Sequence, residues 1–191
     1  MKNGLSSQQD RSVRIIGGKW RGRKVTFPTS TTIRPTPDRV RETLFNWLMA
    51  DIAGASCLDL YAGSGAIGLE ALSRGASEVC FIDSDPRVIN NLQQNLNILE
   101  ADPDRYQLIT SPVDSWLSVT RDPFDLIFID APFAADTWIN DCQRIASEKL
   151  ARRAVYLETG RAVTAGELPA DWTLHRQKKA GAVHFCLCFC G

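Results

Sequence analysis

Two short stretches hold residues whose types and spacing suit chemistry at the end of a strand. The first, 125-DLIFIDAPFAAD-136, places an apolar run directly before Asp130, which is followed by Ala131, Pro132 and Phe133. A carboxylate beside an aromatic ring offers hydrogen-bond acceptors together with a surface on which a planar base can stack. The pattern indicates a binding turn, and its alternative is an ordinary strand-terminating turn with the phenylalanine in the core.

The second stretch, 59-DLYAGSGAIG-68, is a glycine loop between a predicted strand and a predicted helix. Gly63, Gly65 and Gly68 fit the pattern G-x-G-x-x-G, which lets backbone amides approach a ligand without an intervening Cβ. Another acid, Asp83, ends the next predicted strand, where it can accept hydrogen bonds from a ribose diol. Together these residues predict a nucleotide-like ligand.

An acid at the inner end of the glycine loop separates two classes of ligand. Asp59 lies four residues before Gly63, where its charge would repel the pyrophosphate of a dinucleotide. S-adenosylmethionine has no phosphate and carries an ammonium and a sulfonium group, which a carboxylate favours. The acid therefore indicates the methyl donor as cofactor and leaves an NAD-linked oxidoreductase as a distant alternative.

Alternating strands and helices are needed to bring these acids to one edge of a sheet. Helices are predicted at 66–75, from Asp85-Pro86 onward, and after Thr36 as N-cap with Pro37 at the first helical position. Apolar runs predict five core strands and two weaker tail strands, at 57–61, 79–83, 106–110, 125–129 and 154–158, then at 172–176 and 182–190. This order predicts a parallel sheet covered on both faces, with ligands beyond the carboxyl ends of its strands.

The composition fits one domain of ordinary size with a basic appendage. The 191 residues are 44% hydrophobic, enough for a core, and no apolar segment approaches the length of a membrane helix. Since MKNGLSSQQD lacks a signal-peptide pattern, we expect a cytoplasmic protein without membrane contact. We also expect a monomer. Formal net charge is zero, yet residues 1–41 hold ten Lys/Arg and two acids, which indicates either a polyanion contact or a solvated basic face.

The six cysteines are interpreted as small buried hydrophobes. Cys57 and Cys80 lie in apolar runs, and Cys186, Cys188 and Cys190 alternate with apolar residues at strand spacing, which places these three on one face. No CxxC pair occurs, and the two histidines lack the spacing of a zinc finger. We therefore expect no metal site and no structural disulfide.

Several sequence blocks resemble a known enzyme family. The motifs 59-DLYAGSG-65, 83-DSD-85 and 130-DAPF-133, in this order, resemble class I S-adenosylmethionine-dependent methyltransferases. The last is similar to the [DN]-P-P-[YF] signature of enzymes that methylate exocyclic amino nitrogens of bases. The longer blocks 14-RIIGGKWRGRKV-25 and 34-RPTPDRVRETLFNWL-48 are similar to the bacterial family that makes N2-methylguanine in 16S rRNA, and the resemblance covers nearly the whole chain after residue 12.

The resemblance implies a fold, an activity and a set of site residues. The fold is α/β and Rossmann-like, a seven-stranded, mostly parallel sheet with a reversed last hairpin and a small N-terminal β-hairpin extension. The activity is methyl transfer from S-adenosylmethionine to a guanine N2 amine in an assembled or partly assembled small ribosomal subunit. Asp130, the carbonyl of Ala131, Pro132 and Phe133 would hold the base. The cofactor residues would be Asp59, Tyr61, Gly63, Ser64, Gly65, Gly68, Asp83, Ser84, Val113 and Asp114.

Two positions depart from the family pattern. Ala131 stands where the family has its first proline, and because the contact needs only a backbone carbonyl, we expect activity to persist. Pro112 stands where relatives have an Asp or Asn that binds the adenine amino group. We expect Asp114 or the backbone near Val113 to substitute, with weakened cofactor affinity.

The resemblance also gives the basic N-terminus a partner, 16S rRNA. Arg14, Lys19, Arg21, Arg23 and Lys24, with Trp20 interleaved, would neutralise RNA phosphates in a salt-dependent contact. The glycines within 13–28 predict a hairpin, so residues 1–30 form a basic arm and hairpin and residues 31–191 the methyltransferase domain. Arg34, Arg39 and Arg41 either order the segment over the cofactor or pair with local acids.

Two other functions stay open at this point. An adenine-N6 DNA methyltransferase shares the acid–proline–aromatic turn, but a target-recognition domain does not fit in 191 residues. A non-catalytic ribosome-binding or assembly protein would keep the fold and lose activity through Ala131 and Pro112.

Overall fold

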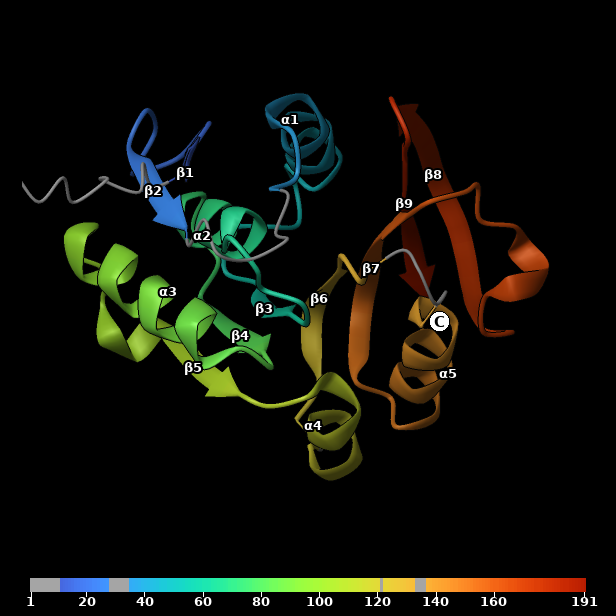
Figure 1. Cartoon of the computed structure of the whole chain (residues 1–191). Helices are drawn as coiled ribbons and strands as arrows, with labels where there is room; N and C mark the ends of the chain where they lie inside the picture. Colours follow the sequence, from blue (N-terminus) through green and yellow to red (C-terminus); the bar gives the residue numbers. More distant parts are fainter. Residues whose placement is uncertain (1–10, 28–34, 121, 133–136) are drawn as a thin grey trace, which may run out of the picture.

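A seven-stranded sheet forms the centre of the molecule, seen in a computed structural model that describes residues 11–27, 35–120, 122–132 and 137–191 (Figure 1). The strand order is β5-β4-β3-β6-β7-β9-β8. The strands are β3 (Ser56–Asp59), β4 (Glu78–Asp83), β5 (Tyr106–Thr110), β6 (Phe124–Ile129), β7 (Ala151–Thr159), β8 (Trp172–Ala180) and β9 (Val183–Cys190). Neighbours from β5 to β7 are parallel, and β9 runs antiparallel to both β7 and β8. The predicted sheet with a reversed last hairpin is confirmed.

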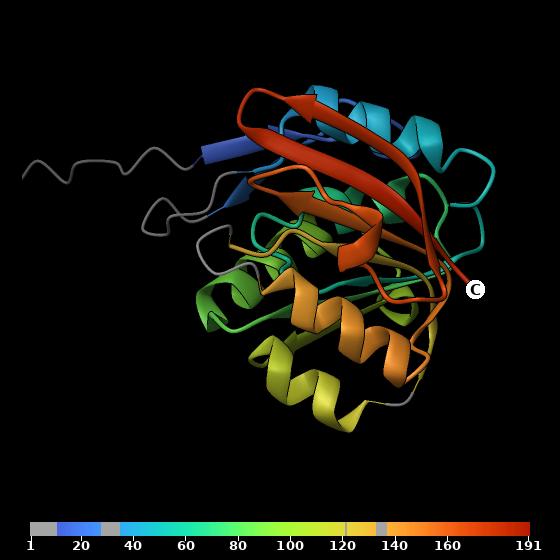
Figure 2. The same cartoon turned by 90° about the vertical axis from the view of Figure 1, so that its right-hand side faces the viewer.

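Helices cover both faces of the sheet. Helices α1 (Asp38–Trp47), α2 (Ala66–Ser73) and α3 (Pro86–Ile98) pack on one face, and α4 (Val113–Val119) and α5 (Trp138–Ser147) on the other (Figure 2). Short 3-10 turns span Pro103–Arg105 and Ala165–Glu167. Two buried apolar clusters result, because alternate residues of each strand face opposite sides.

The basic N-terminal segment forms the predicted hairpin. Strands β1 (Arg11–Arg14) and β2 (Lys24–Phe27) are antiparallel, with Val13 opposite Val25. Their apolar side chains belong to the same buried cluster as those of α1, α2 and α3. The hairpin is therefore fastened to the body, while a division into domains at residue 30 stays a prediction.

The predicted start of α1 is wrong by one residue. Pro37, with extended backbone angles (φ −57°, ψ 146°), is the N-cap, and no side chain caps the helix. Thr36 lies one position earlier, and its hydroxyl donates to Asp130 Oδ2 at 3.3 Å instead. The local pattern suited a cap, but a partner 94 residues away takes the hydroxyl.

The cysteines of the last strand lie on one face, as predicted. Cys186 and Cys188 are buried in the cluster under α4 and α5, whereas Phe185 and Leu187 face the opposite cluster. All six cysteines are free thiols, and burial raises the pKa of the Cys80 thiol to about 12. Among the described helices, none is both long and apolar enough to cross a membrane.

Candidate active site

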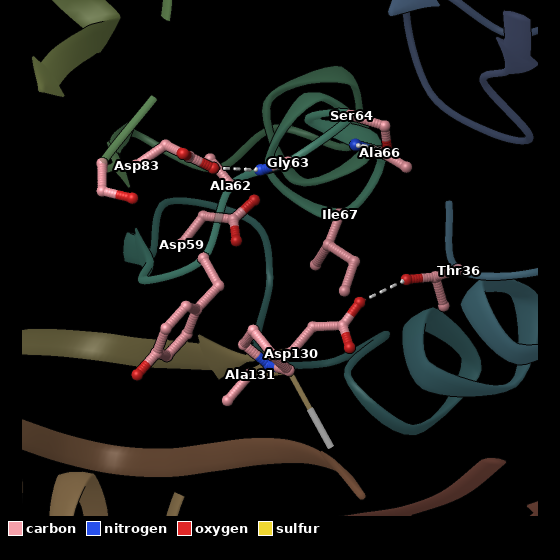
Figure 3. Close-up of a pocket in the computed structure, with 13 residues that line it drawn as sticks. Thr36, Asp59, Ala62, Gly63, Ser64, Ala66, Ile67, Asp83, Asp130 and Ala131 are labelled. Carbon is pink, nitrogen blue, oxygen red and sulfur yellow. Dashed lines mark hydrogen bonds between the residues drawn. The ribbon is translucent and has the colours of Figure 1, made fainter. Parts of the chain in front are cut away.

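A cavity of about 370 Å³ opens at the carboxyl edge of the sheet, where β3, β4 and β6 end (Figure 3). Its size suits a small ligand. The residues that line it come from the glycine loop, from two strand ends and from the segment before α1: Thr36, Asp59, Tyr61, Ala62, Gly63, Ser64, Ala66, Ile67, Asp83, Ser84, Asp130, Ala131 and Pro132. The structure thus brings together most of the residues that the sequence placed with the cofactor and the base.

Two glycines of the loop serve packing and lie outside the cavity lining. Gly65 is the N-cap of α2 with φ +73°, and a Cβ there would lie 2.2 Å from Leu92 Cδ2. At Gly68 a Cβ would lie 2.2 Å from Phe81 Cε1 on β4. A larger residue at Gly65 would press against α3, and one at Gly68 would push α2 from the sheet. Both glycines therefore shape the loop that presents Gly63 and Ser64 to the cavity.

The acids at the ends of β3 and β4 hold the loop. Asp83 accepts from the backbone N–H of Gly63 at 3.0 Å with one oxygen and from that of Asp85 at 2.9 Å with the other. Each carboxylate oxygen has a further lone pair, so the side chain can still accept from a ligand diol. Asp59 is buried and accepts from Gly68 N–H at 3.0 Å.

Burial perturbs the acid at the end of β3. Desolvation raises the pKa of Asp59 to about 7, the hydrogen bond from Gly68 lowers it, and the negative charges of Asp130 and Asp83 raise it further. Among the described residues that line the cavity, three are acids and none has a cationic side chain. The site therefore favours a positively charged ligand over a phosphate.

The acid after β6 faces the same cavity. Asp130 is half-buried, and desolvation raises its pKa to about 6, while the hydrogen bond from Thr36 lowers it. Figure 3 shows the Asp130 carboxylate turned toward Thr36. Next to it Ala131 is buried and Pro132 exposed, and both line the cavity. Phe133 lies outside the described residues.

A further buried acid, Glu158, was missed from the sequence. It lies near the end of β7, one position after the pair Ile129–Leu157, and accepts from the Tyr156 hydroxyl at 2.9 Å. Desolvation raises its pKa to about 8, as does the charge of Asp130, while hydrogen bonds with Tyr156 and Thr36 lower it. Its signal was present, because it ends a predicted strand as Asp83 and Asp130 do.

The raised pKa of Glu158 predicts how stability depends on pH. Between its ordinary 4.5 and about 8 the folded protein holds a proton that the unfolded chain has released, so the free energy of unfolding falls as pH rises through this range. Glu158→Gln keeps an acceptor for Tyr156 and removes the ionisation. Relative to wild type, the free energy of unfolding of the variant should be higher at pH 8.5 than at pH 5 by about 2–4 kcal/mol. The measurement is the difference in melting temperature between variant and wild type at each of the two pH values. The same difference in melting temperature between variant and wild type at both pH values would contradict this.

Helix α5, which was not predicted, supplies a partner for the loop tyrosine. Tyr61 lines the cavity and donates from its hydroxyl to Asp141 Oδ2 at 2.8 Å. Asp141 is buried, and desolvation raises its pKa to about 6, against the lowering by the Tyr61 bond. The contact fixes the tyrosine ring at the cavity wall.

The residues expected near the adenine lie apart from this cavity lining. Pro112 is the N-cap of α4, Val113 is the buried first residue of that helix, and Asp114 is exposed in its first turn. Neither Val113 nor Asp114 is among the described residues that line the cavity. Their contact with an adenine group stays a prediction.

The basic hairpin presents its cations to solvent but not its tryptophan. Five of the proposed RNA contacts are exposed, namely Arg14, Lys19, Arg21, Arg23 and Lys24. Trp20 is only 5% exposed and packs in the core cluster with Val25 and Phe27, because the neighbouring turn lies on the end of α2. The interleaved indole is thus a core residue, a correction to the expected RNA-facing ring.

The structure gives one of the arginines, Arg41, contacts of both proposed kinds. Arg41 is fully buried and pairs with two local acids, Asp38 at 2.6 Å and Glu70 at 3.4 Å. Its Nε also donates to the Thr36 carbonyl at 3.2 Å. Arg41 therefore both pairs with acids and holds the segment beside the cavity. Arg39 is exposed, and Arg34 lies outside the described residues.

Comparison with known proteins places the chain in a family. The family model described as Conserved hypothetical protein 95 matches residues 13–189. The chain belongs to this family. Together with the relatives described next, this match confirms the family resemblance inferred from the sequence blocks.

Members of the family are similar along almost their whole length. Ribosomal RNA small subunit methyltransferase D of Escherichia coli strain K12 is 43% identical over 181 residues, which cover 92% of this chain and 88% of the relative. The Haemophilus influenzae protein of the same name is 39% identical over 182 residues, with 92% of each covered. The solved structure of yhhF from Escherichia coli superimposes with a TM-score of 0.84 at 40% identity, covering 94% of this chain and 98% of that one.

Proposed function

We propose that this protein transfers a methyl group from S-adenosylmethionine to the exocyclic N2 amine of a guanine in 16S rRNA of the small ribosomal subunit. Its family relatives are named as methyltransferases of small-subunit ribosomal RNA, which supports the reaction class and the substrate RNA. The acid–Ala–Pro turn at 130–132 supports an amino nitrogen as the acceptor.

One observation supports the cofactor above all others: the described cavity lining contains three carboxylates and no cation. S-adenosylmethionine has an ammonium, a sulfonium and a ribose diol. Asp83 is suited to accept hydrogen bonds from the diol. Asp59 and the adjacent loop are suited to contact the ammonium and the sulfonium. A pyrophosphate would face Asp59 at the base of the loop and be repelled.

Asp130 and its turn supply what an amine of low nucleophilicity needs. The guanine N2 lone pair is delocalised into the ring, and acceptors for its two N–H groups favour pyramidalisation. Asp130 would accept one N–H and the Ala131 carbonyl the other. When bound, S-adenosylmethionine supplies the sulfonium methyl that the freed lone pair attacks in line, leaving S-adenosylhomocysteine. The methylated nitrogen then gives up one proton, which Asp130 would accept.

Three acceptors distinguish this function from its rivals. The protein is incubated with S-adenosylmethionine labelled on the methyl group and with small subunits lacking the modification, their free rRNA, or duplex DNA. We expect label in the rRNA of the subunits. Label in DNA adenine would select a DNA methyltransferase, and tight ribosome binding without label would select a non-catalytic assembly protein.

The pKa of Asp59 predicts that cofactor affinity depends on pH. A cationic ligand binds best when this carboxyl is ionised, and its pKa is raised to about 7 in the free protein. Calorimetric titrations should therefore show about five- to tenfold tighter binding of S-adenosylmethionine at pH 7.5 than at pH 6, with protons released on binding. Asp59→Asn should bind more weakly at both pH values and lose this dependence. If the affinity of the wild type did not vary with pH, Asp59 would not contact the cationic groups of S-adenosylmethionine.

A further inference from the structure

A chain of hydrogen bonds leads from the basic hairpin to the acid at 130. Arg41 Nη2 donates to the backbone carbonyl of Arg14 on β1 at 2.9 Å, and its Nε donates to the carbonyl of Thr36 at 3.2 Å. The Thr36 hydroxyl then donates to Asp130 Oδ2 at 3.3 Å. One buried arginine thus connects β1, which carries the exposed Arg14, with Thr36 at the cavity.

The arginine is held by a second set of contacts. Glu70 on α2 is fully buried and pairs with Arg41 at 3.4 Å and with Arg74 at 2.7 Å. It also accepts from the backbone N–H groups of Ile16 and Gly17 in the hairpin, both at 2.7 Å. The Glu70 carboxylate, with this many partners, has little freedom to move. The Arg41 guanidinium that pairs with it is therefore held in a fixed position.

Thr36 lies at the boundary of two cavities. It lines the 370 Å³ cavity of the active site and also a second cavity of about 340 Å³, between the hairpin and the start of α1. Its side chain is buried, with a fractional exposure of 5%. Because so little of the side chain is exposed, its hydroxyl depends on a neighbouring polar group as hydrogen-bond partner, and that group is Asp130.

The groups around Asp130 are otherwise acidic or neutral. Asp59 approaches from β3, and Tyr156 and Glu158 approach from β7. Burial raises the pKa of Asp130, and the Thr36 hydroxyl, which also lowers the pKa of Glu158, lowers it. The bond at 3.3 Å is the one to Asp130. Without that donor, the carboxyl would be protonated over a wider pH range and would offer the amine one acceptor fewer.

We propose that Thr36 and Arg41 are positioning residues for the methyl-transfer step. Arg41 fixes the Thr36 backbone between hairpin and active site, and the Thr36 hydroxyl holds Asp130 as a charged acceptor turned toward the substrate amine. The inference rests on the proposed function for its catalytic consequence, while the contact between Thr36 and Asp130 stands on the geometry alone. It extends the site to a residue whose sequence pattern indicated only a helix cap.

The test compares Thr36→Val with Thr36→Ser. Valine keeps the shape of the side chain and loses the hydroxyl, whereas serine keeps the hydroxyl. Thr43→Val is the matched control, because the Thr43 hydroxyl donates only one turn back along α1, to the Arg39 carbonyl. For Thr36→Val we expect the acid limb of the pH–rate profile to move up by about one pH unit, which by itself about halves kcat at pH 7. Loss of the contact that orients the carboxylate should lower kcat by a further factor of about two to five. Thr36→Ser and Thr43→Val should keep the wild-type profile.

A measurement independent of turnover separates this inference from the proposed function. Carbon-13 NMR titration of the Asp130 carboxyl, assigned by loss of its signal in Asp130→Asn, should give a higher pKa in Thr36→Val than in wild type. An unchanged titration, or a Thr36→Ser variant as slow as Thr36→Val, would overturn the proposal. If the wild type made no N2-methylguanine while the titration shifted as expected, only the proposed function would fail.

The part played by Arg41 is tested through additivity. Arg41→Lys keeps a charge for Glu70, but a single ammonium cannot also reach the carbonyls of Thr36 and Arg14 as the guanidinium does. We expect Arg41→Lys to shift the acid limb as Thr36→Val does, and the double variant to shift it no further. Additive shifts would remove Arg41 from this role. If Arg41→Lys does not fold, the Thr36 variants still decide whether the hydroxyl positions Asp130.

Discussion

Asp130→Asn should lower kcat by about 10²–10³-fold, the effect of losing one group that stabilises developing charge in a water-poor site. The asparagine has the same shape, but its amide gives one acceptor and places N–H donors toward an amine that needs acceptors. It also cannot take up the proton that the methylated nitrogen releases. Single-turnover kinetics at saturating S-adenosylmethionine and saturating small subunit measure this step.

The loss should lie in turnover and leave folding intact. Asp130 is half-buried and burial raises its pKa to about 6, so removing its charge should leave the melting temperature at neutral pH equal to or above that of wild type. Asp122→Asn, an exposed acid just before β6, serves as the matched control and should retain full activity. A kcat for Asp130→Asn within threefold of wild type would mean that the turn at 130–132 does not hold the amine.

The second large effect is expected at the end of β4. Asp83→Ala removes the acceptor for a ribose diol and also releases the backbone N–H groups of Gly63 and Asp85, which shape the loop. Hydrogen bonds to charged groups contribute about 1.5–3 kcal/mol each, so the Kd for S-adenosylmethionine should rise about 10²-fold or more. Because Asp83 lies at the far end of the cavity from Asp130, kcat at saturating cofactor should fall much less than affinity.

An exposed acid provides the comparison for this variant. Asp104 lies in the 3-10 turn before β5, outside the cavity lining. The variant Asp104→Ala should therefore bind S-adenosylmethionine as tightly as the wild type does. Isothermal titration calorimetry gives both affinities. If Asp83→Ala retained wild-type affinity, the diol would have to bind elsewhere, and the glycine loop would have a structural function alone.

The main elements of the sheet could be predicted from the sequence because their signals are local. The run LIFI within β6 and the run VCFI within β4 are apolar on both faces, which is what a strand buried between two helical layers requires. Seven strands could be counted from the apolar runs, but the reversal of the last hairpin came from the family resemblance, since the alternation in β8 and β9 alone gives no direction of pairing.

The missed parts depend on distant contacts or on weak patterns. Helix α4 has seven residues, two of them buried, and no side chain caps it, so its sequence hardly differs from a loop. In α5 the buried residues Trp138, Cys142 and Ile145 do recur at helical spacing, and this signal was available. Thr36 suited an N-cap locally, and only the fold brings its hydroxyl to Asp130.

The same distinction holds for the site. The acids at 59, 83 and 130 follow apolar runs, so their common edge could be predicted from a parallel sheet. The buried environment that raises the pKa of Asp59, Asp130 and Glu158 could not, because it comes from layers packed above and below. Burial of Trp20 depends likewise on where the hairpin meets α2.

The most direct test of the central claim is the chemical position of the transferred methyl group. Small subunits lacking the modification are incubated with the wild-type protein and labelled S-adenosylmethionine, the 16S rRNA is digested to nucleosides, and the methylated guanosines are separated by chromatography and mass spectrometry. The account predicts that the label co-elutes with N2-methylguanosine and is absent with Asp130→Asn. Label at a ring nitrogen of guanine, or on another base, would contradict it.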